Sequence, residues 1–183
     1  MNDTQIDFIF KITVIGDSGV GKTSLIKQYT QSSFENDYIS TIGAQFSIYN
    51  EEIDGGKFKL FLWDIAGEKD FKFLRAQFYT KSKAAIIVYS LEENDHGRKS
   101  FKHIIEWYKD IKEYCGEIPV IIFANKVDLI DERNFDDTEV QKLVKENNFL
   151  GIYYTSAKTG KKVTEAFQYI IKFLYNQAKN KIY

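Results

Sequence analysis

Apolar residues along this 183-residue chain fall into two alternating patterns. The first consists of short runs rich in apolar residues. Those that are almost continuous, such as Ala85–Val88 and Val120–Phe123, are typical of strands buried on both faces of a sheet. The turn Asp54-Gly55-Gly56 has the composition of a hairpin connection between two such runs. The predicted strands are Phe8–Ile15, Gln45–Ile53, Lys57–Asp64, Ala84–Tyr89, Val120–Ala124 and Gly151–Thr155.

The second pattern repeats apolar residues at helical spacing between the strands. It predicts helices over Lys22–Gln31, a stretch near Phe71–Thr80, Ser100–Tyr114, Thr138–Asn147 and Val163–Ala178. The last has one apolar stripe, which we expect in the core: Val163, Ala166, Phe167, Ile170, Ile171 and Leu174. Alternating strands and helices predict an α/β fold over residues 1–183. We expect one P-loop domain, a six-stranded mixed, mostly parallel sheet with helices on both faces, and flexible ends at 1–7 and 179–183.

Composition narrows the choice of function. The net charge of −1 lacks the basic excess that is typical of nucleic-acid-binding proteins, so we expect no nucleic-acid partner. Cys115 is the only cysteine, which excludes an intramolecular disulfide and fits a reducing compartment. The longest apolar stretches are too short to span a bilayer, and Asn2 excludes N-myristoylation. We therefore expect a cytoplasmic protein with no stable membrane anchor and at most transient membrane association.

The strongest chemical signal follows the first strand and leads into the first helix. Its residues fit the pattern G-x-x-x-x-G-K-T of a phosphate-binding loop, whose backbone N–H groups and following helix N-terminus favour phosphate. Lys22 would reach the β- and γ-phosphates, and the Thr23 hydroxyl would hold Mg²⁺. The alternative is a glycine-rich turn before a helix. The candidate phosphate-binding residues are Gly16, Asp17, Ser18, Gly19, Val20, Gly21, Lys22, Thr23 and Ser24.

Further polar motifs follow other predicted strands, where ligands bind in open α/β sheets. Asp64-Ile65-Ala66-Gly67 follows the third strand. Asp64 would hold Mg²⁺ through water, and the Gly67 N–H would contact the γ-phosphate. Between the first helix and second strand, Thr41 would complete Mg²⁺ coordination when a γ-phosphate is present. Phe34 would pack edge-on against the base, although either residue can equally be an ordinary loop residue.

Asn125-Lys126-Val127-Asp128 follows the fifth strand. A carboxylate accepts from both adjacent donors of guanine, N1–H and N2–H₂, so Asp128 would select guanine over adenine. Lys126 would lay its aliphatic stem on the purine face, and Asn125 would tie this loop to the phosphate loop. The alternative is a polar turn. After the sixth strand, a backbone N–H near Ala157, in the motif Thr155-Ser156-Ala157-Lys158, would bind the guanine O6.

Together these motifs resemble those of small GTPases of the Ras superfamily over residues 8–178, and most closely the Rab-like branch. The resemblance implies GTP or GDP with Mg²⁺, slow GTP hydrolysis, and loops around Thr41 and Gly67 that γ-phosphate orders. It also implies protein partners: effectors, exchange factors or GTPase-activating proteins. These would meet the switch loops and an exposed triad of Phe46, Trp63 and Phe78, although the three aromatics can instead be core residues.

Glu68 stands where this family usually has a water-positioning glutamine. An ionised carboxylate accepts hydrogen bonds but cannot donate, and it faces a negative γ-phosphate. The predicted catalytic residues are Lys22, Gly67 and Glu68. One hypothesis is a slow GTPase in which Glu68 orients water, and the alternative is a GTP-binding interaction module with little or no hydrolysis. An ATP-dependent phosphotransferase shares the phosphate loop but leaves Asp128 unexplained.

Three further features depart from the family pattern. No Lys or Arg lies between Gln28 and Gly56, so that segment supplies no arginine finger. Leu91–Lys99 is a few residues longer than expected, and we expect a solvated loop there, with a partner contact as the alternative. His96 and His103 are expected on the surface without a role. Paired C-terminal cysteines are missing, so either the protein is not stably lipidated or the sequence is truncated.

Overall fold

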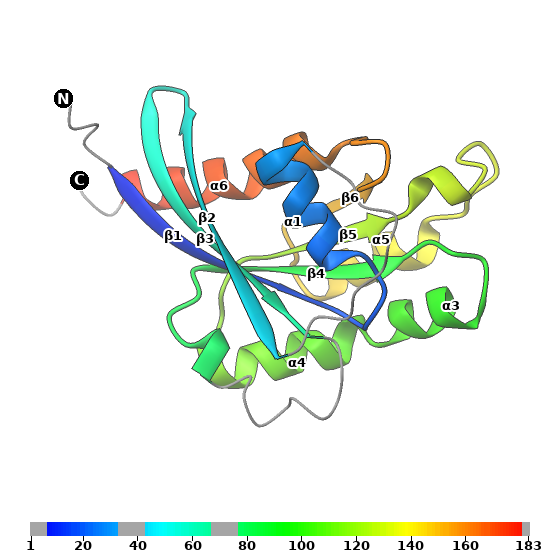
Figure 1. The fold of residues 1–183 in the computed structure, drawn as a ribbon. Coiled ribbons are helices and arrows are strands. Elements are labelled where there is room, and N and C mark those ends of the chain that lie inside the picture. The colour runs from blue at the N-terminus through cyan, green and yellow to red at the C-terminus, as the bar shows by residue number, and fades with distance from the viewer. Residues whose placement is uncertain (1–6, 33–42, 67–76, 181–183) are drawn as a thin grey trace.

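The fold was obtained as a computed structural model, which describes residues 7–32, 43–66 and 77–180. Its strands are β1 Phe8–Ile15, β2 Ala44–Ile53, β3 Gly56–Ile65, β4 Ala84–Ser90, β5 Val120–Asn125 and β6 Ile152–Thr155. Its helices are α1 Lys22–Gln31, α3 Asp95–Lys102, α4 Ile104–Cys115, α5 Thr138–Glu146 and α6 Val163–Lys179, with a 3₁₀ turn, η2, at Val127–Leu129. Figure 1 shows these elements along the chain.

The strands form one sheet in the order β2-β3-β1-β4-β5-β6. Only the β2–β3 pair is antiparallel, and the other four pairs are parallel. The predicted hairpin turn is confirmed: Asp54 and Gly55 have φ of 50° and 79°, and Ile53 pairs with Gly56. Positive φ at both turn residues matches the twist of the flanking strands. The predicted six-stranded mixed, mostly parallel sheet is therefore correct.

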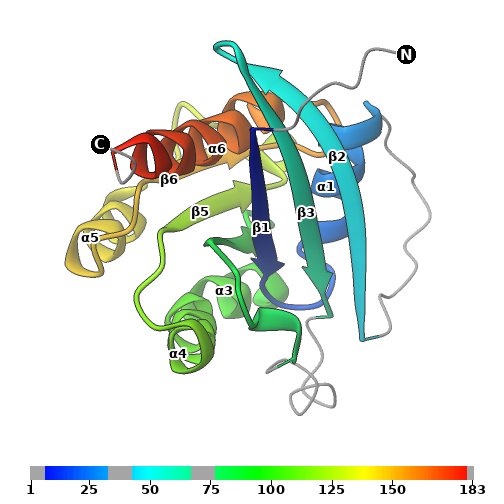
Figure 2. The ribbon, with the colours of Figure 1, turned by 90° about the vertical axis from the view of Figure 1, so that its left-hand side faces the viewer.

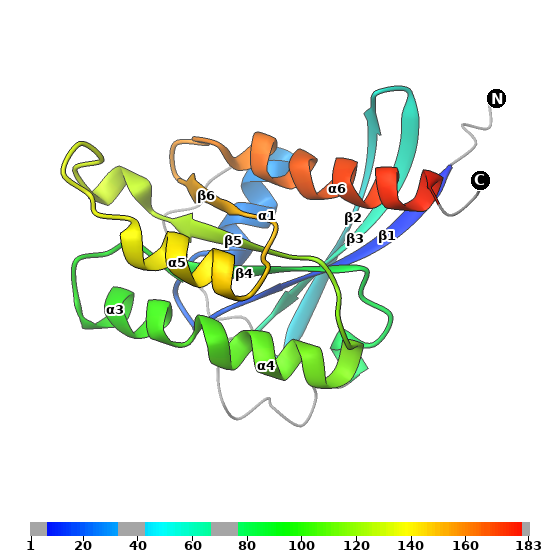
Figure 3. The ribbon, with the colours of Figure 1, turned by 180° about the vertical axis from the view of Figure 1, so that it is seen from behind.

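Helices cover both faces of this sheet, as predicted (Figure 2). One core packs α1 and α6 against one face, and a second packs α4 and α5 against the other. Seen from behind, α3 and α4 follow one another along the second face (Figure 3). Because the sheet is covered on both sides, a central strand such as β4 is buried at every position, which explains its near-continuous apolar sequence.

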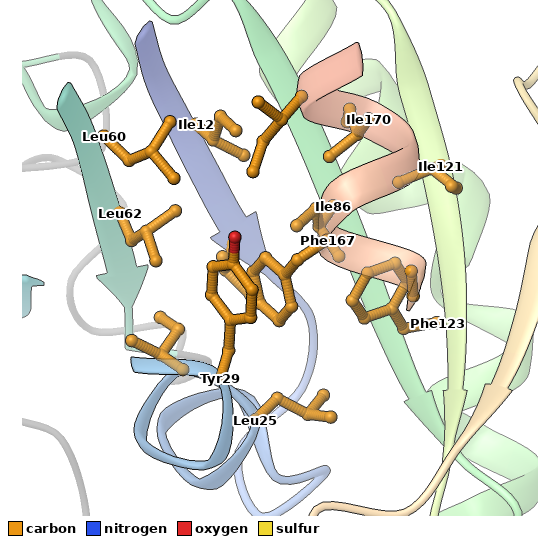
Figure 4. Close-up of a cluster of buried hydrophobic side chains, with 14 of the residues drawn as sticks. Ile12, Leu25, Tyr29, Leu60, Leu62, Ile86, Ile121, Phe123, Phe167 and Ile170 are labelled. Carbon is orange, nitrogen blue, oxygen red and sulfur yellow. The ribbon is translucent and has the colours of Figure 1, made fainter. Parts of the chain in front are cut away.

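The stripe predicted on the C-terminal helix is confirmed, because all six of its residues are buried on α6. Phe167 lies at its centre, between Tyr29 of α1 and Phe123 of β5 (Figure 4). Its ring stacks on Tyr29 with centroids 4.3 Å apart and meets Phe123 edge-on at 5.3 Å. These contacts hold α1, which follows the phosphate loop, against the sheet.

The segment between β4 and β5 differs from the prediction. A solvated loop was expected over Leu91–Lys99, followed by one helix over Ser100–Tyr114. Instead α3 begins at Asp95, where the Asn94 side chain accepts from the Gly97 N–H at 2.9 Å, and α4 continues after a break at His103. Gly97 weakens the helical pattern in the sequence. Its lack of a side chain is required by the close backbone of the preceding segment, because a Cβ there would lie 2.0 Å from the Glu92 carbonyl oxygen.

Two further expectations concern the ends and the membrane. Residues 1–6 and 181–183 lie outside the described residues, so flexibility of the ends stays a prediction. Asp7 is described and exchanges two hydrogen bonds of 2.9 Å with Lys57. Of the helix expected near Phe71–Thr80, only a turn at 77–79 is described. In the parts of the chain that the structure describes, each helix is too short or too polar to span a bilayer.

The connections place the candidate residues at one edge of the sheet. From β1 the chain passes through α1 to β2 and β3 on one side, and then returns to β4 on the other side. The carboxyl ends of β1 and β4 therefore form a topological switch point, where ligands of open α/β sheets bind.

Candidate functional site

The phosphate loop connects β1 to α1 and passes very close to neighbouring strands. Gly16 and Gly21 have φ of 140° and 98°, in the region that favours glycine. A Cβ on Gly16 would lie 2.1 Å from the Val88 carbonyl oxygen, and one on Gly21 would lie 2.3 Å from the Asn125 amide nitrogen. These two glycines are therefore fixed by packing, and a glycine-rich surface turn does not account for them.

Lys22 is the first residue of α1, yet its side chain is only 6% exposed. Its ammonium group donates to the carbonyl oxygens of Gly16 at 3.0 Å and Asp17 at 2.8 Å. A buried ammonium group requires such acceptors. The lysine predicted to reach phosphate thus already lies against the loop that precedes it, next to the N-terminus of α1, where backbone N–H groups and the helix dipole favour an anion.

Thr23 and Asp64 come from α1 and from the end of β3, and the structure brings them into contact. The Thr23 hydroxyl donates to Asp64 Oδ2, and Asp64 is 3% exposed. A hydroxyl and a carboxylate next to a phosphate loop are the hard oxygen ligands that Mg²⁺ prefers, usually together with water and phosphate. The described residues therefore fit a Mg²⁺ ion, for which Thr23 and Asp64 would supply the protein oxygens.

Asn125 at the end of β5 connects three loops through its buried side chain. Its amide nitrogen donates to the Val20 carbonyl oxygen in the phosphate loop at 2.9 Å. Its amide oxygen accepts from the Ala157 N–H at 3.1 Å and from the Thr155 hydroxyl at 3.4 Å. The expected tie between this loop and the phosphate loop is therefore present. The Ala157 N–H, expected to meet guanine O6, is used here to join the loops.

In the predicted base loop, Lys126 and Asp128 lie at a short turn and have different partners. Lys126 has φ of 69° and precedes η2, in which Asp128 is exposed. The Ser156 hydroxyl donates to Asp128 Oδ1 at 2.5 Å, which brings the turn of Ser156, Ala157 and Lys158 beside this carboxylate. One carboxylate oxygen is oriented by Ser156 while the group still faces solvent, an arrangement that suits recognition of paired N–H donors.

Sequence reasoning missed a set of contacts that hold the phosphate loop from outside. Asp17 is bound at both carboxylate oxygens, by His103 Nδ1 at 2.7 Å and by Trp107 Nε1 at 2.8 Å. His96 Nε2 lies 2.7 Å from the Ser18 carbonyl oxygen. Both histidines remain partly exposed, but the expectation that they have no role ignored these contacts.

A nearby carboxylate was missed as well. Glu92 Oε2 lies 2.6 Å from Lys126 Nζ, and so contacts the predicted base loop directly. The sequence held one available signal: Glu92 follows the end of a predicted strand, at the same edge of the sheet as the recognised motifs.

Four predicted site residues lie outside the described residues: Phe34, Thr41, Gly67 and Glu68. Their expected roles stay predictions. The other predicted site residues lie in loops or at the ends of elements, at the same edge of the sheet. They are the residues from Gly16 to Ser24 together with Asp64, Asn125, Lys126, Asp128, Ser156, Ala157 and Lys158.

The three aromatic residues expected to meet partners form a continuous row. Phe46 and Trp63 are cross-strand partners with ring centroids 5.4 Å apart, and Trp63 lies 5.6 Å from Phe78. Phe46 is 58% exposed, whereas Trp63 and Phe78 are partly buried against the second core. Lys11 Nζ lies 4.4 Å from the centre of the Trp63 ring. The row therefore combines core packing at one end with an exposed ring at the other.

A central strand that runs into a glycine loop and then a helix places this chain among the P-loop nucleotide-binding domains. The sequence model of the Ras family matches residues 11–176. The chain is 39% identical to Ras-related protein Rab-13 of Canis lupus familiaris over 162 residues, which cover 88% of this chain and 77% of that protein. It is 35% identical to Ras-related protein Rab-15 of Homo sapiens over 164 residues, which cover 89% and 75%.

This chain belongs to the Ras family. It is a Rab-like small GTPase, a class of GTP-binding proteins that act as switches.

Proposed function

We propose that this chain is a switch that binds GTP or GDP together with Mg²⁺, hydrolyses GTP slowly, and presents its switch loops to protein partners. The observation that carries the proposal is the Asn125 side chain, which bonds to both the phosphate loop and the turn at Ala157. A ligand that spans these loops needs phosphates at one end and a base at the other. Asp128, exposed beside that turn, provides the acceptor that distinguishes guanine from adenine.

Hydrolysis would proceed by in-line attack of a water oxygen on the γ-phosphorus, with cleavage of the bond to the β-phosphate oxygen. Lys22 and the backbone N–H groups of the phosphate loop would stabilise the negative charge on the phosphate oxygens. Thr23 and Asp64 would hold Mg²⁺, which supplies further neutralisation of that charge when it is bound. The products are GDP and inorganic phosphate, and the proton lost by water passes to phosphate or solvent.

Glu68 decides between the slow GTPase and the alternative, a binding module with little hydrolysis. In its protonated form Glu68 can donate to phosphate and accept from water, as glutamine does, whereas in its ionised form it only accepts. The negative γ-phosphate favours the protonated form. We therefore propose that hydrolysis persists and depends on pH between about 5 and 8.

Nucleotide extraction and single-turnover kinetics test this proposal. Guanine nucleotide should be recovered from the purified protein, and phosphate should be released from bound GTP only with Mg²⁺. Glu68→Gln should flatten the pH profile and stay within about 100-fold of the parent rate, whereas Glu68→Leu should lose roughly 10²-fold or more. A leucine variant as fast as the parent would remove Glu68 from the chemistry and favour the binding module.

The partner surface of the proposed switch is the row of Phe46, Trp63 and Phe78 together with the switch loops. Its support is the exposed Phe46 ring stacked on Trp63, since aromatic anchors are enriched in protein interfaces. A cytoplasmic location with at most transient membrane association also stays a proposal. Sedimentation with neutral and anionic vesicles tests it, and salt-resistant binding would contradict it.

A further inference from the structure

The segment that follows β4 lies between the phosphate loop and the base loop and contacts both. The Leu91 N–H donates to the Asn125 carbonyl oxygen at 2.9 Å, which holds the start of this segment at the end of β5. From there, Glu92 contacts the base loop and His96 contacts the phosphate loop. We call Glu92 and His96 the α3 brace, because His96 lies in the first turn of α3 and Glu92 just before the helix.

Glu92 reaches toward the base loop. Its Oε2 accepts from Lys126 Nζ at 2.6 Å and from the Ser90 hydroxyl at 2.9 Å. The Glu92 and Lys126 side chains are only 25% and 26% exposed, so this ion pair is screened less than one on the open surface. The contact holds the ammonium group of Lys126, the residue whose aliphatic stem is proposed to lie on the purine.

His96 lies beside Glu92 and contacts the phosphate loop. Its Nδ1 lies 3.4 Å from Glu92 Oε2, and its Nε2 lies 2.7 Å from the Ser18 carbonyl oxygen. A carbonyl oxygen only accepts, so Nε2 carries the hydrogen. Within one trans peptide, C=O and N–H point in opposite directions. Holding the Ser18 carbonyl on α3 therefore turns the Gly19 N–H away from α3, and keeps this donor of the phosphate loop in one orientation.

The neighbouring loop residue is also held from this side. His103 and Trp107 occupy both carboxylate oxygens of Asp17, while Lys22 holds its carbonyl oxygen. Asp17 and Ser18 are thus attached to α3 and α4 at two consecutive positions. Glu92 of the α3 brace contacts Lys126, so that α3 and the residues just before it contact both the phosphate end and the base end of the site.

We propose that Glu92 and His96 are positioning residues that slow nucleotide release by holding Lys126 and the Ser18 carbonyl in their ligand-binding arrangement. The proposal rests on the proposed function, because it concerns the same nucleotide site. Neither side chain needs to touch the nucleotide. Binding to a site that is already held in its binding conformation costs less free energy of ordering. Differences in affinity of this kind appear mainly in the dissociation rate.

The test is the dissociation of fluorescently labelled GDP from the full chain, in Mg²⁺ and with an excess of unlabelled GDP. His96→Ala and Glu92→Ala should each speed release by about 5- to 10-fold, the scale of one lost hydrogen bond. The double variant should speed release by less than the product of the two single effects, because both residues belong to one contact network.

Position-specific rescue separates positioning from a general loss of structure. In a His96→Gln variant the side-chain amide nitrogen would occupy the position of the histidine Nε2. In a His96→Asn variant it would occupy the position of Nδ1. His96→Gln should therefore release GDP within about 2-fold of the parent, since the donor to Ser18 survives, whereas His96→Asn should behave like His96→Ala. Arg98→Ala is the matched control on the same helix, because the Arg98 side chain pairs with the exposed Asp95, and its release rate should equal that of the parent.

Unchanged release in His96→Ala and Glu92→Ala, with labelled GDP bound by the parent, would overturn the brace and leave the proposed function standing. Equal acceleration in the Ala, Gln and Asn variants would also overturn it, because the effect would not follow the donor position. Failure of the parent to retain labelled GDP would instead refute the proposed function, and the brace with it.

Discussion

Individual side chains at the sheet edge carry most of the specificity that we propose. Asp128 is oriented by the Ser156 hydroxyl yet remains exposed, and Asn125 is buried and uses both ends of its amide to join loops. Two residues of the same motif are thus placed differently: Asp128 faces solvent, where the proposed base would bind, and Asn125 lies in the protein interior. Substitutions at these positions should accordingly have different effects.

Asp128→Asn should weaken GTP binding by on the order of 10²-fold or more, because it removes charge-assisted hydrogen bonds worth roughly 1.5–3 kcal/mol each. It should improve relative binding of xanthosine triphosphate, whose base has a carbonyl where guanine has the N2 amino group, since an amide can donate to it. A competition assay with both nucleotides measures the change. Unchanged discrimination would remove Asp128 from the base site.

Glu92 should make the free energy of unfolding of the protein depend on pH in the acid range. Partial burial favours its protonated form, but the hydrogen bonds from Lys126 and Ser90 and the nearby charges of Lys126 and His96 outweigh burial, so that its pKa lies below the usual value. The folded state therefore binds fewer protons at this group than the unfolded state. The stabilisation is present above the unfolded pKa of about 4.3, and it is lost as pH falls through the lower folded pKa.

Urea unfolding of GDP-loaded protein between about pH 3 and 7 measures this effect. The free energy of unfolding of the parent should fall more steeply with acid than that of Glu92→Gln, and the difference between the two should shrink toward low pH. Glu93→Gln is the matched control, because Glu93 is adjacent and exposed. A constant difference between Glu92→Gln and the parent across the range would contradict the assignment.

At the level of elements, α3 is fitted closely to the segment before it. The Ser100 hydroxyl accepts from the Ser90 N–H at 3.0 Å and donates to the Gly97 carbonyl oxygen at 2.8 Å. The Asn94 N–H donates to the Glu92 carbonyl oxygen at 2.8 Å. The position of α3, and with it the α3 brace, therefore depends on close backbone contact with the end of β4.

Gly97→Ala should destabilise the protein by about 1–3 kcal/mol, although alanine forms helices better than glycine. The added Cβ would lie 2.0 Å from the Glu92 carbonyl oxygen and 3.1 Å from that of Ser90, so α3 must shift. Denaturant unfolding measures the loss. Lys99→Ala, at an exposed position of the same helix, should change stability by no more than about 0.5 kcal/mol. A Gly97→Ala variant as stable as the parent would show that the contact is easily relieved.

For the whole molecule, the loops at the sheet edge come from segments far apart in the chain. Asn125, for example, bonds to Val20, which is 105 positions away in the sequence, and to Ala157, which is 32 positions away. A ligand that contacts all of these loops binds the folded state and not the unfolded chain. Its binding must therefore stabilise the entire domain by mass action.

GDP with Mg²⁺ at about 100 times its Kd should stabilise the protein by about 2.7 kcal/mol and raise its Tm by roughly 5–10 °C. A thermal melt with and without nucleotide checks this. ADP at the same concentration should have little effect, and Asp128→Asn should lose most of the GDP effect. An increase with ADP equal to that with GDP would favour the ATP-dependent alternative.

The sequence by itself determined the strands, the order of the motifs and the residue types in each motif. Short apolar runs and the 3.6-residue apolar period are local features of the sequence, which is why β1 and α1 match their predicted bounds and the stripe on α6 is buried. The phosphate loop and the base loop are also continuous in sequence. Their residue types were therefore enough to predict a guanine-nucleotide site and to predict that Asn125 joins the loops.

The tertiary structure alone decided how α3 meets the site. Gly97 and Asn94 suggest a loop from their residue types, and the folded path of the backbone, which brings the Glu92 carbonyl oxygen close, explains why a glycine lies inside this helix. Asp17 and His103 are 86 residues apart, and Ser18 and His96 are 78 apart. No pattern within either segment predicts such pairs, because a contact between distant residues depends on the position of whole elements, and packing against the sheet sets that position.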